Sequence, residues 1–143
     1  MSQNESQATT SDGRYMALTH NIRVFVEPAY LEDRSDPEAG QHVWAYTIEI
    51  RNEGRQTVQL KERCWEITDG NGKIEMVQGA GVVGEQPVLK PGDAFEYTSG
   101  CPLGTDSGFM VGRYTMQSAD NTTFEIDIPA FALDLPTARR VMN

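Results

Sequence analysis

Three glycines stand at the spacing G-x-G-x-x-G in the stretch GAGVVGEQP: Gly79, Gly81 and Gly84. This spacing is typical of loops whose backbone N–H groups hold nucleotide phosphates. In dinucleotide-binding folds such glycines lie between a strand and a helix, and the helix N-terminus stabilises the pyrophosphate. The chemistry to be weighed is therefore the binding of a phosphate anion.

The residues after these glycines argue against a nucleotide-binding fold. Pro87 and Pro91 would each remove a helical hydrogen bond, so EQPVLKPGD does not supply the required helix. The Walker pattern fails as well, because Glu85 and Gln86 follow Gly84 in place of Lys and Ser or Thr. Only a weaker form of phosphate binding stays open.

That weaker form is an anion nest, in which successive N–H groups of a glycine-rich turn bind the ligand without a helix. The candidate nest residues are Gly79, Gly81, Val82, Val83 and Gly84, and the candidate supporting cations are Lys73, Lys90 and Arg113. Glu75, Glu85 and Asp93 lie in the same region and oppose an anion. We favour the alternative in which the glycines shape a bulged loop between strands, with Val82 and Val83 packed inward.

No catalytic constellation is found among the nucleophiles and bases. His20 and His42 lie in or beside expected strands, and Ser99 is not part of a G-x-S-x-G elbow. Cys101 has no cation or helix N-terminus in its sequence neighbourhood to lower the pKa of its thiol. We therefore predict that the protein is not an enzyme and needs no cofactor.

Metal ligands are scattered along the chain. The two histidines and two cysteines have no short spacing that would make two of them neighbours. The acidic run LEDRSDPE lacks the D-x-D-x-D-G spacing of a calcium loop. Its oxygen ligands are Glu32, Asp33, Asp36 and Glu38. We predict a solvated loop here and no specific metal site.

Composition bounds the remaining possibilities. The chain has 143 residues, of which 38% are hydrophobic, which fits one domain with a thin core. Its 12 basic and 21 acidic residues leave a net charge of −9, which repels nucleic acid and acidic membrane surfaces. The two cysteines, the polar N-terminus and the lack of a long apolar run predict a cytoplasmic protein.

The elements that must position the glycine loop alternate with period two. In VWAYTIEIRN, the apolar residues Trp44, Tyr46, Ile48 and Ile50 fall on one face, as in a half-buried strand. The same pattern recurs in HNIRVFVEP, AFEYTSG, FMVGRYTMQ and TFEIDIPAF, and the phase slips near Lys61 to Arg63, which predicts a bulge. At least seven strands separated by Gly, Pro and Asn turns indicate an all-β antiparallel sandwich or barrel.

Several long stretches resemble the ApaG (CorD) family, the longest being GAGVVGEQPVLKPGDAFEYTSGCPLGTDSGFMVGRYTM. Others are IRVFVEPAYLEDRSDPE, YTIEIRNEG, WEITDGNG and FEIDIPAFAL. The resemblance implies a fibronectin type III-like, that is immunoglobulin-like, β-sandwich of two antiparallel sheets. It also implies links to cobalt resistance, to magnesium efflux and to a suspected pyrophosphate contact at the glycines. Cys64 stands before Trp65 where family members often have Arg or His, which removes one cation from this stretch.

We predict a disordered tail over residues 1–14, one sandwich domain over residues 15–135 and a C-terminal tail over residues 136–143. The favoured function is a non-enzymatic module that binds a protein partner, with Tyr30, Leu31, Val82, Val83 and Phe109 as candidate contacts. The last three of these we expect in the core. Two alternatives stay open: a nucleotide or dinucleoside polyphosphate held at the glycine loop, and a divalent cation. A monomer or a weak homodimer through an edge strand is expected.

Overall fold

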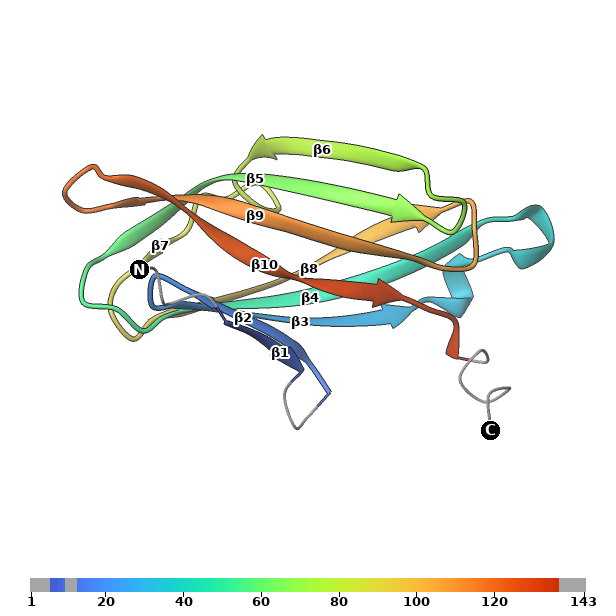
Figure 1. Ribbon diagram of the computed structural model, residues 1–143, viewed down its shortest axis with the longest axis horizontal. Helices are drawn as coiled ribbons and strands as arrows, with labels where there is room; N and C mark the ends of the chain where they lie inside the picture. The colour runs from blue at the N-terminus through green and yellow to red at the C-terminus, as the bar shows by residue number, and fades with distance from the viewer. Residues whose placement is uncertain (1–5, 10–12, 137–143) are drawn as a thin grey trace.

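Two antiparallel sheets pack face to face in the computed structural model, which describes residues 6–9 and 13–136 (Figure 1). One sheet has the strand order β1-β2-β3-β4-β8, and the other has the order β10-β9-β5-β6, with β7 also paired to β5. The strands are β1 (Ser6–Thr9), β2 (Tyr15–Thr19), β3 (Ile22–Tyr30), β4 (His42–Asn52), β5 (Val58–Asp69), β6 (Ile74–Ala80), β7 (Val88–Leu89), β8 (Ala94–Leu103), β9 (Gly108–Ser118) and β10 (Thr123–Leu133). The predicted all-β sandwich is confirmed.

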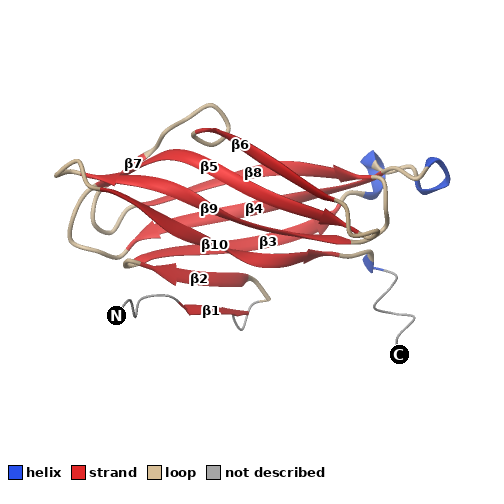
Figure 2. Ribbon diagram, turned by 45° about the horizontal axis from the view of Figure 1, so that its top comes forward, coloured by secondary structure: helices blue, strands red, loops and turns tan. Residues whose placement is uncertain are grey.

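The strands of the two sheets overlie one another in Figure 2, and the core between the sheets is built by the alternating residues. Trp44, Tyr46, Ile48 and Ile50 of β4 are all buried, as their period of two predicts. From the opposite sheet, Trp65 packs edge-on against the Tyr46 ring, with the ring centroids 5.3 Å apart. The acidic loop between β3 and β4 forms two single 3-10 turns, η1 (Glu32–Arg34) and η2 (Pro37–Ala39).

The predicted bulge in β5 is confirmed at Lys61. Leu60 pairs with Met116 of β9, whereas Glu62 pairs with Thr115, so one residue of β5 has no counterpart. Beyond the bulge the inward and outward faces of β5 are exchanged. Arg63 therefore points to the same side as the buried Trp65, toward the interior. This matters for the glycine turn, because Arg63 pairs with Gly79 of β6.

Two of the three residues expected in the core lie outside it. Val82 is buried, as predicted, but the side chains of Val83 and Phe109 are 54% and 46% exposed. Val83 stands at the tip of a turn with a φ of 44°, which directs its side chain to solvent. Phe109 precedes the buried Met110 on β9, so the pleat places it on the outer face.

The predicted tail over residues 1–14 contains one strand that sequence reasoning missed, because β1 pairs in register with β2. Arg14, also inside that range, forms an ion pair with Glu49 over 3.0 Å. At the other end, the Trp44 Nε1–H donates to the Asp134 carbonyl over 2.9 Å. Predictions for residues 1–5, 10–12 and 137–143 lie outside the described residues.

Candidate functional site

The glycine motif forms the turn at the end of β6, an edge strand of its sheet. Val82 and Glu85 exchange two backbone hydrogen bonds of 2.8 Å, and the Gly81 N–H donates to the Lys61 carbonyl over 2.9 Å. The two residues at the tip, Val83 and Gly84, have φ angles of 44° and 81°. Positive φ at both central positions is typical of tight hairpin turns.

Two glycines of the motif lie in close contacts, Gly81 with the backbone and Gly79 with the end of an arginine side chain. Gly81 has a φ of 65°, and a Cβ there would lie 2.2 Å from the Glu85 carbonyl oxygen. A Cβ on Gly79 would lie 2.8 Å from Nη1 of Arg63, which faces it across the β5–β6 ladder. The glycines therefore leave room for a turn and for an arginine beneath it.

Arg63 is the functional-site residue that sequence reasoning missed. Its Nη1 donates to the Gly81 carbonyl over 2.9 Å and to the Ala80 carbonyl over 3.2 Å, so the guanidinium clamps the end of β6. Further inward, the hydroxyls of Tyr97 and Tyr114 are hydrogen-bonded over 2.5 Å. Burial raises the pKa of the Tyr97 hydroxyl, and the positive charge of Arg63 partly opposes that rise.

The three cations selected from the sequence do not converge on the turn. Lys73 lies at the opposite end of β6, where its carbonyl accepts from the Asp69 N–H. The acceptor Lys61 and the donor Asp69 are eight residue steps apart along β5, or about 26 Å at about 3.3 Å per residue. Lys90 belongs to a separate turn closed by Asp93. Of these three cations, only Arg113 lines a cavity that Gly79 also lines.

That cavity has a volume of about 360 Å³ and is lined by residues of β5, β6, β9 and β10, among them Gly79 and Ala80. Its charged lining residues are Glu62, Arg63, Arg113 and Glu125. Arg113 forms an ion pair with Glu125 over 3.4 Å. The two carboxylates offset the two guanidinium charges. Because the N–H groups of Gly81 and Val82 are also engaged in the turn, few donors remain for an anion.

A second feature of β6 is the apolar outer face beside it. Ile74 of β6 and Phe109 of β9 each pair with Thr68 of the intervening β5, so the three residues form a row. Met76 and Val111 flank Glu66 in the next row. The exposed fractions of Ile74 and Met76 are 56% and 52%. We call Ile74, Met76, Phe109 and Val111 the apolar strip.

The reactive side chains do not assemble in the part of the chain that the structure describes. Burial raises the pKa of the Cys101 thiol to about 11, so its thiolate is scarce at neutral pH. The His42 Nδ1 shares a hydrogen bond of 2.9 Å with the Tyr30 hydroxyl. Within residues 6–9 and 13–136, no three His, Cys, Asp or Glu side chains meet at a point that would hold a metal ion. No described helix has the length and apolar character needed to cross a membrane.

The two stacked antiparallel sheets, with the glycine turn at the end of an edge strand, define an immunoglobulin-like β-sandwich domain. A family model described as the ApaG domain matches residues 32–118. The chain belongs to the ApaG family, in agreement with the resemblance of its motifs.

Relatives match over nearly the whole chain. The Protein ApaG of Brucella anthropi is 59% identical over 129 residues, covering 90% of this chain and 99% of that protein. The Protein ApaG of Mesorhizobium japonicum is 58% identical with the same coverage. Among solved structures, the putative ApaA protein of Bordetella pertussis has a TM-score of 0.79 at 46% identity, covering 80% of this chain and 94% of that one.

Proposed function

We propose that this ApaG domain is a non-enzymatic binding module whose ligand is another protein. The observation that supports this most is the apolar strip. Large apolar side chains that lie together on the outside of a domain mark interaction surfaces more often than scattered ones do. Here Ile74 and Phe109 lie in one row, and Met76 and Val111 in the next.

The position of the strip at a sheet edge adds to this argument. β6 is the last strand of its sheet, so its outer row of N–H and C=O groups is available for pairing. A partner segment in extended conformation can add to such an edge through main-chain hydrogen bonds while its alternate side chains cover the neighbouring face. The strip and the edge therefore act as one binding surface.

The charge around the surface constrains the partner. Glu66 lies inside the strip and Glu62 lies further along the same face of β5, on a chain whose net charge is −9. Complementary charge speeds association and excludes wrong partners. We expect the partner segment to carry apolar residues at alternate positions, flanked by Lys or Arg.

Photo-cross-linking in the native cell tests the proposal. A photoreactive phenylalanine analogue replaces Phe109, and in a matched control the same analogue replaces Thr98, which is exposed on the outer face of the other sheet. We expect a polypeptide adduct from position 109 that is absent from position 98. Introducing Met76→Lys should remove the adduct while the protein stays folded.

Two results would reject protein binding at this surface. One is the absence of any adduct at position 109. The other is an adduct pattern identical at positions 109 and 98, because it would reflect random collisions. An adduct made of two copies of this chain would assign the surface to a homodimer, which mass spectrometry identifies directly.

The alternative of a phosphate ligand at the glycine turn has a separate test. Because Gly81 and Val82 already donate within the turn, we expect ATP, diadenosine tetraphosphate and pyrophosphate, each with and without magnesium, to leave the amide NMR signals of residues 79–84 unchanged. Saturable shifts of these signals would revive the anion-binding function.

A further inference from the structure

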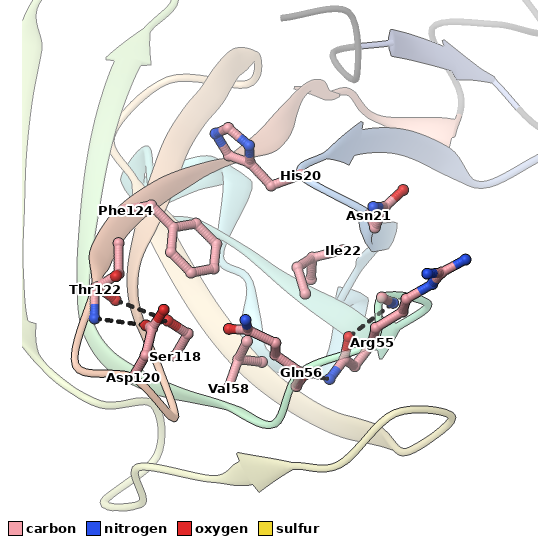
Figure 3. Close-up of a pocket in the computed structure, with 12 residues that line it drawn as sticks. His20, Asn21, Ile22, Arg55, Gln56, Val58, Ser118, Asp120, Thr122 and Phe124 are labelled. Carbon is pink, nitrogen blue, oxygen red and sulfur yellow. Dashed lines mark hydrogen bonds between the residues drawn. The ribbon is translucent and has the colours of Figure 1, made fainter.

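A second cavity opens at one end of the sandwich, away from the apolar strip (Figure 3). Three loops meet there: β2–β3 with His20 and Asn21, β4–β5 with Gln56, and β9–β10 with Asp120. The cavity has a volume of about 370 Å³, within the range of small-molecule sites. Binding sites of sandwich domains are commonly built from such loop clusters.

The floor of the cavity is apolar. It is lined by Ile22 and Val58, which are buried in the core, and by the half-buried Phe124 ring. The His20 imidazole meets the Phe124 ring edge-on, with the centroids 5.4 Å apart. Figure 3 shows the amide of Gln56 extending toward Phe124. An apolar or aromatic group would therefore find a flat, partly enclosed floor with a hydrogen-bonding amide beside it.

Asp120 places a carboxylate on the rim of the cavity. Its Oδ1 accepts from the Ser118 hydroxyl over 2.5 Å and from the Thr122 N–H over 3.0 Å. These two donors fix the orientation of the carboxylate. Among the described residues, no Lys, Arg or His side chain forms an ion pair with this carboxylate. A preorganised acceptor of this kind is suited to a charged donor.

We propose that this cavity binds a small organic cation, with its apolar or aromatic body on Ile22, Val58 and Phe124 and its ammonium group on Oδ2 of Asp120. An anionic ligand fits less well, because the one guanidinium of the lining, that of Arg55, extends away from Phe124 (Figure 3). The net charge of −9 also favours a cation over an anion.

Three probes of nearly equal shape test the charge preference on the full chain: 2-phenylethylammonium, 2-phenylethanol and 3-phenylpropanoate. Binding is followed by amide NMR shifts at millimolar probe concentration. We expect the ammonium probe to bind about two- to fivefold more tightly than the alcohol, which is the range that an ion pair with a solvent-exposed carboxylate supports. The carboxylate should bind more weakly than either, and the saturable shifts should centre on residues 20–22, 52–58 and 118–124.

The variant Asp120→Asn isolates the carboxylate. Asparagine keeps an Oδ1 for Ser118 and Thr122 while removing the charge, so the turn is preserved. We expect the variant to lose the preference for the ammonium probe and to keep its affinity for the alcohol. The matched control is Asp106→Asn, an equal charge change in the β8–β9 loop at the other end of the sandwich.

Equal affinity for the three probes, or no saturable shift with any of them, would overturn the proposal. So would an ammonium preference that survives in Asp120→Asn, because the preference would then come from the net charge alone. The comparison of ammonium with alcohol in the wild-type protein needs no variant, so the proposal stays testable if Asp120→Asn fails to fold.

Discussion

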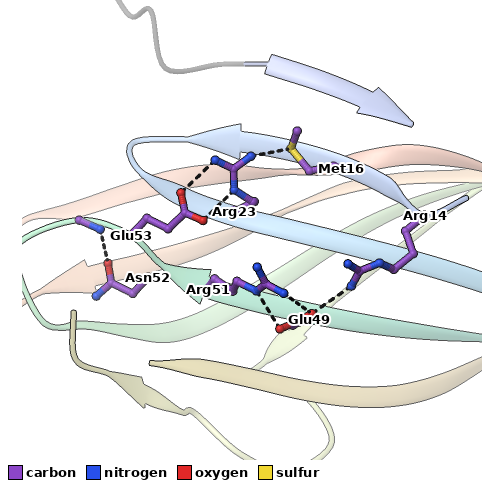
Figure 4. A network of polar contacts seen from close by, with 8 residues as sticks. Arg14, Met16, Arg23, Glu49, Arg51, Asn52 and Glu53 are labelled. Atoms are coloured by element: carbon purple, nitrogen blue, oxygen red, sulfur yellow. Dashed lines mark hydrogen bonds and ion pairs between the residues drawn. The ribbon is translucent and has the colours of Figure 1, made fainter. Parts of the chain in front are cut away.

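The outer faces of the two sheets differ in what covers them. On the β2-β3-β4 face, the guanidinium carbons of Arg14 and Arg51 lie 4.0 and 4.7 Å from the centre of the Phe25 ring, which is buried. Both arginines also form ion pairs with Glu49 (Figure 4). On the β5-β6-β9 face, the apolar strip has no such cover. Phe25 is therefore shielded on its sheet surface, whereas Phe109 is 46% exposed.

The charged face extends along the same sheet. Arg23 forms a two-bond pair with Glu53, at 2.7 and 2.9 Å, and its third contact is to the Met16 sulfur (Figure 4). Such a face has its polar groups already matched to one another. The apolar face instead exposes Ile74, Met76 and Phe109 to solvent, and the glycine motif forms the turn that ends its edge strand.

The largest expected effect concerns the turn that ends the apolar face's edge strand. Gly81→Ala places a Cβ against the Glu85 carbonyl at positive φ, so we expect a loss of about 3 kcal/mol in the free energy of unfolding. Gly84→Ala is the control, because it has positive φ but open space, and it should cost about 1 kcal/mol. Urea denaturation measures both, and equal losses would contradict the steric explanation.

On the charged face, Phe25→Leu keeps most of the apolar volume but removes the ring between the two guanidinium groups. We expect a loss of about 1–2 kcal/mol in unfolding free energy. In an Arg51→Gln background the same substitution should cost less, because one cation has gone. A double-mutant cycle with no coupling between the two positions would refute the cation–π contribution.

Thr68, which lies between Ile74 and Phe109 in the apolar face, has an unpaired hydroxyl: it is buried and has no hydrogen-bond partner among the described residues. Thr68→Val should therefore raise the unfolding free energy by about 1 kcal/mol. Thr98→Val serves as the control, since the Thr98 hydroxyl is bonded to Thr47 and exposed, and no gain is expected there. Destabilisation by Thr68→Val would show that the hydroxyl has an unrecognised partner.

Acid should weaken the charged face. Hydrogen bonds from Arg51, and then from Arg14, hold the pKa of Glu49 below its ordinary value. The stabilisation is therefore complete above the ordinary pKa of a glutamate and is lost as the pH falls through the lowered value. We expect wild type and Glu49→Gln to differ by under about 1 kcal/mol at pH 7 and to converge in acid. A gap that does not narrow would exclude this ionisation as its source.

The smallest effect on stability is expected at the apolar strip. Phe109→Ser combined with Met76→Ser should change the unfolding free energy by no more than about 0.5 kcal/mol, because half of each side chain is already in water. Thermal and urea unfolding measure this. A loss comparable to that of Phe25→Leu would mean that the strip packs within the domain, and the contrast between the faces would fail.

Much of the fold is readable from the sequence, because the period of a strand is two and burial imposes it on the residues. The phase slip near Lys61 correctly predicted a bulge, and that bulge carries Arg63 to the inner face. Arg63 and Trp65 are two residues apart and share one face of β5, and this spacing is the sequence signal that places Arg63 inward. The outward direction of Phe109 follows from its alternation with the buried Met110, which here overrides the general tendency of apolar residues to lie inside.

The candidate sites depended on tertiary structure for a physical reason. A spacing such as G-x-G-x-x-G specifies which residues can take positive φ, but not where their N–H groups find acceptors. The Lys61 carbonyl that accepts from Gly81 is twenty residues away in the chain. Lys73 is closer to Gly81 in sequence than Arg63 is, yet strand geometry places it at the far end of β6.

By itself, the sequence determined the alternating strands, the bulge, the turns and, through its motifs, the family, since these depend on local periodicity and residue type. Only the tertiary structure decided that Ile74 and Phe109 meet across Thr68, that Arg63 lies beneath Gly79, and that three loops enclose a cavity with Asp120 on its rim. These features require segments far apart in the chain to become neighbours. Strand order and register determine which segments become neighbours, and no local sequence pattern encodes strand order or register between distant strands.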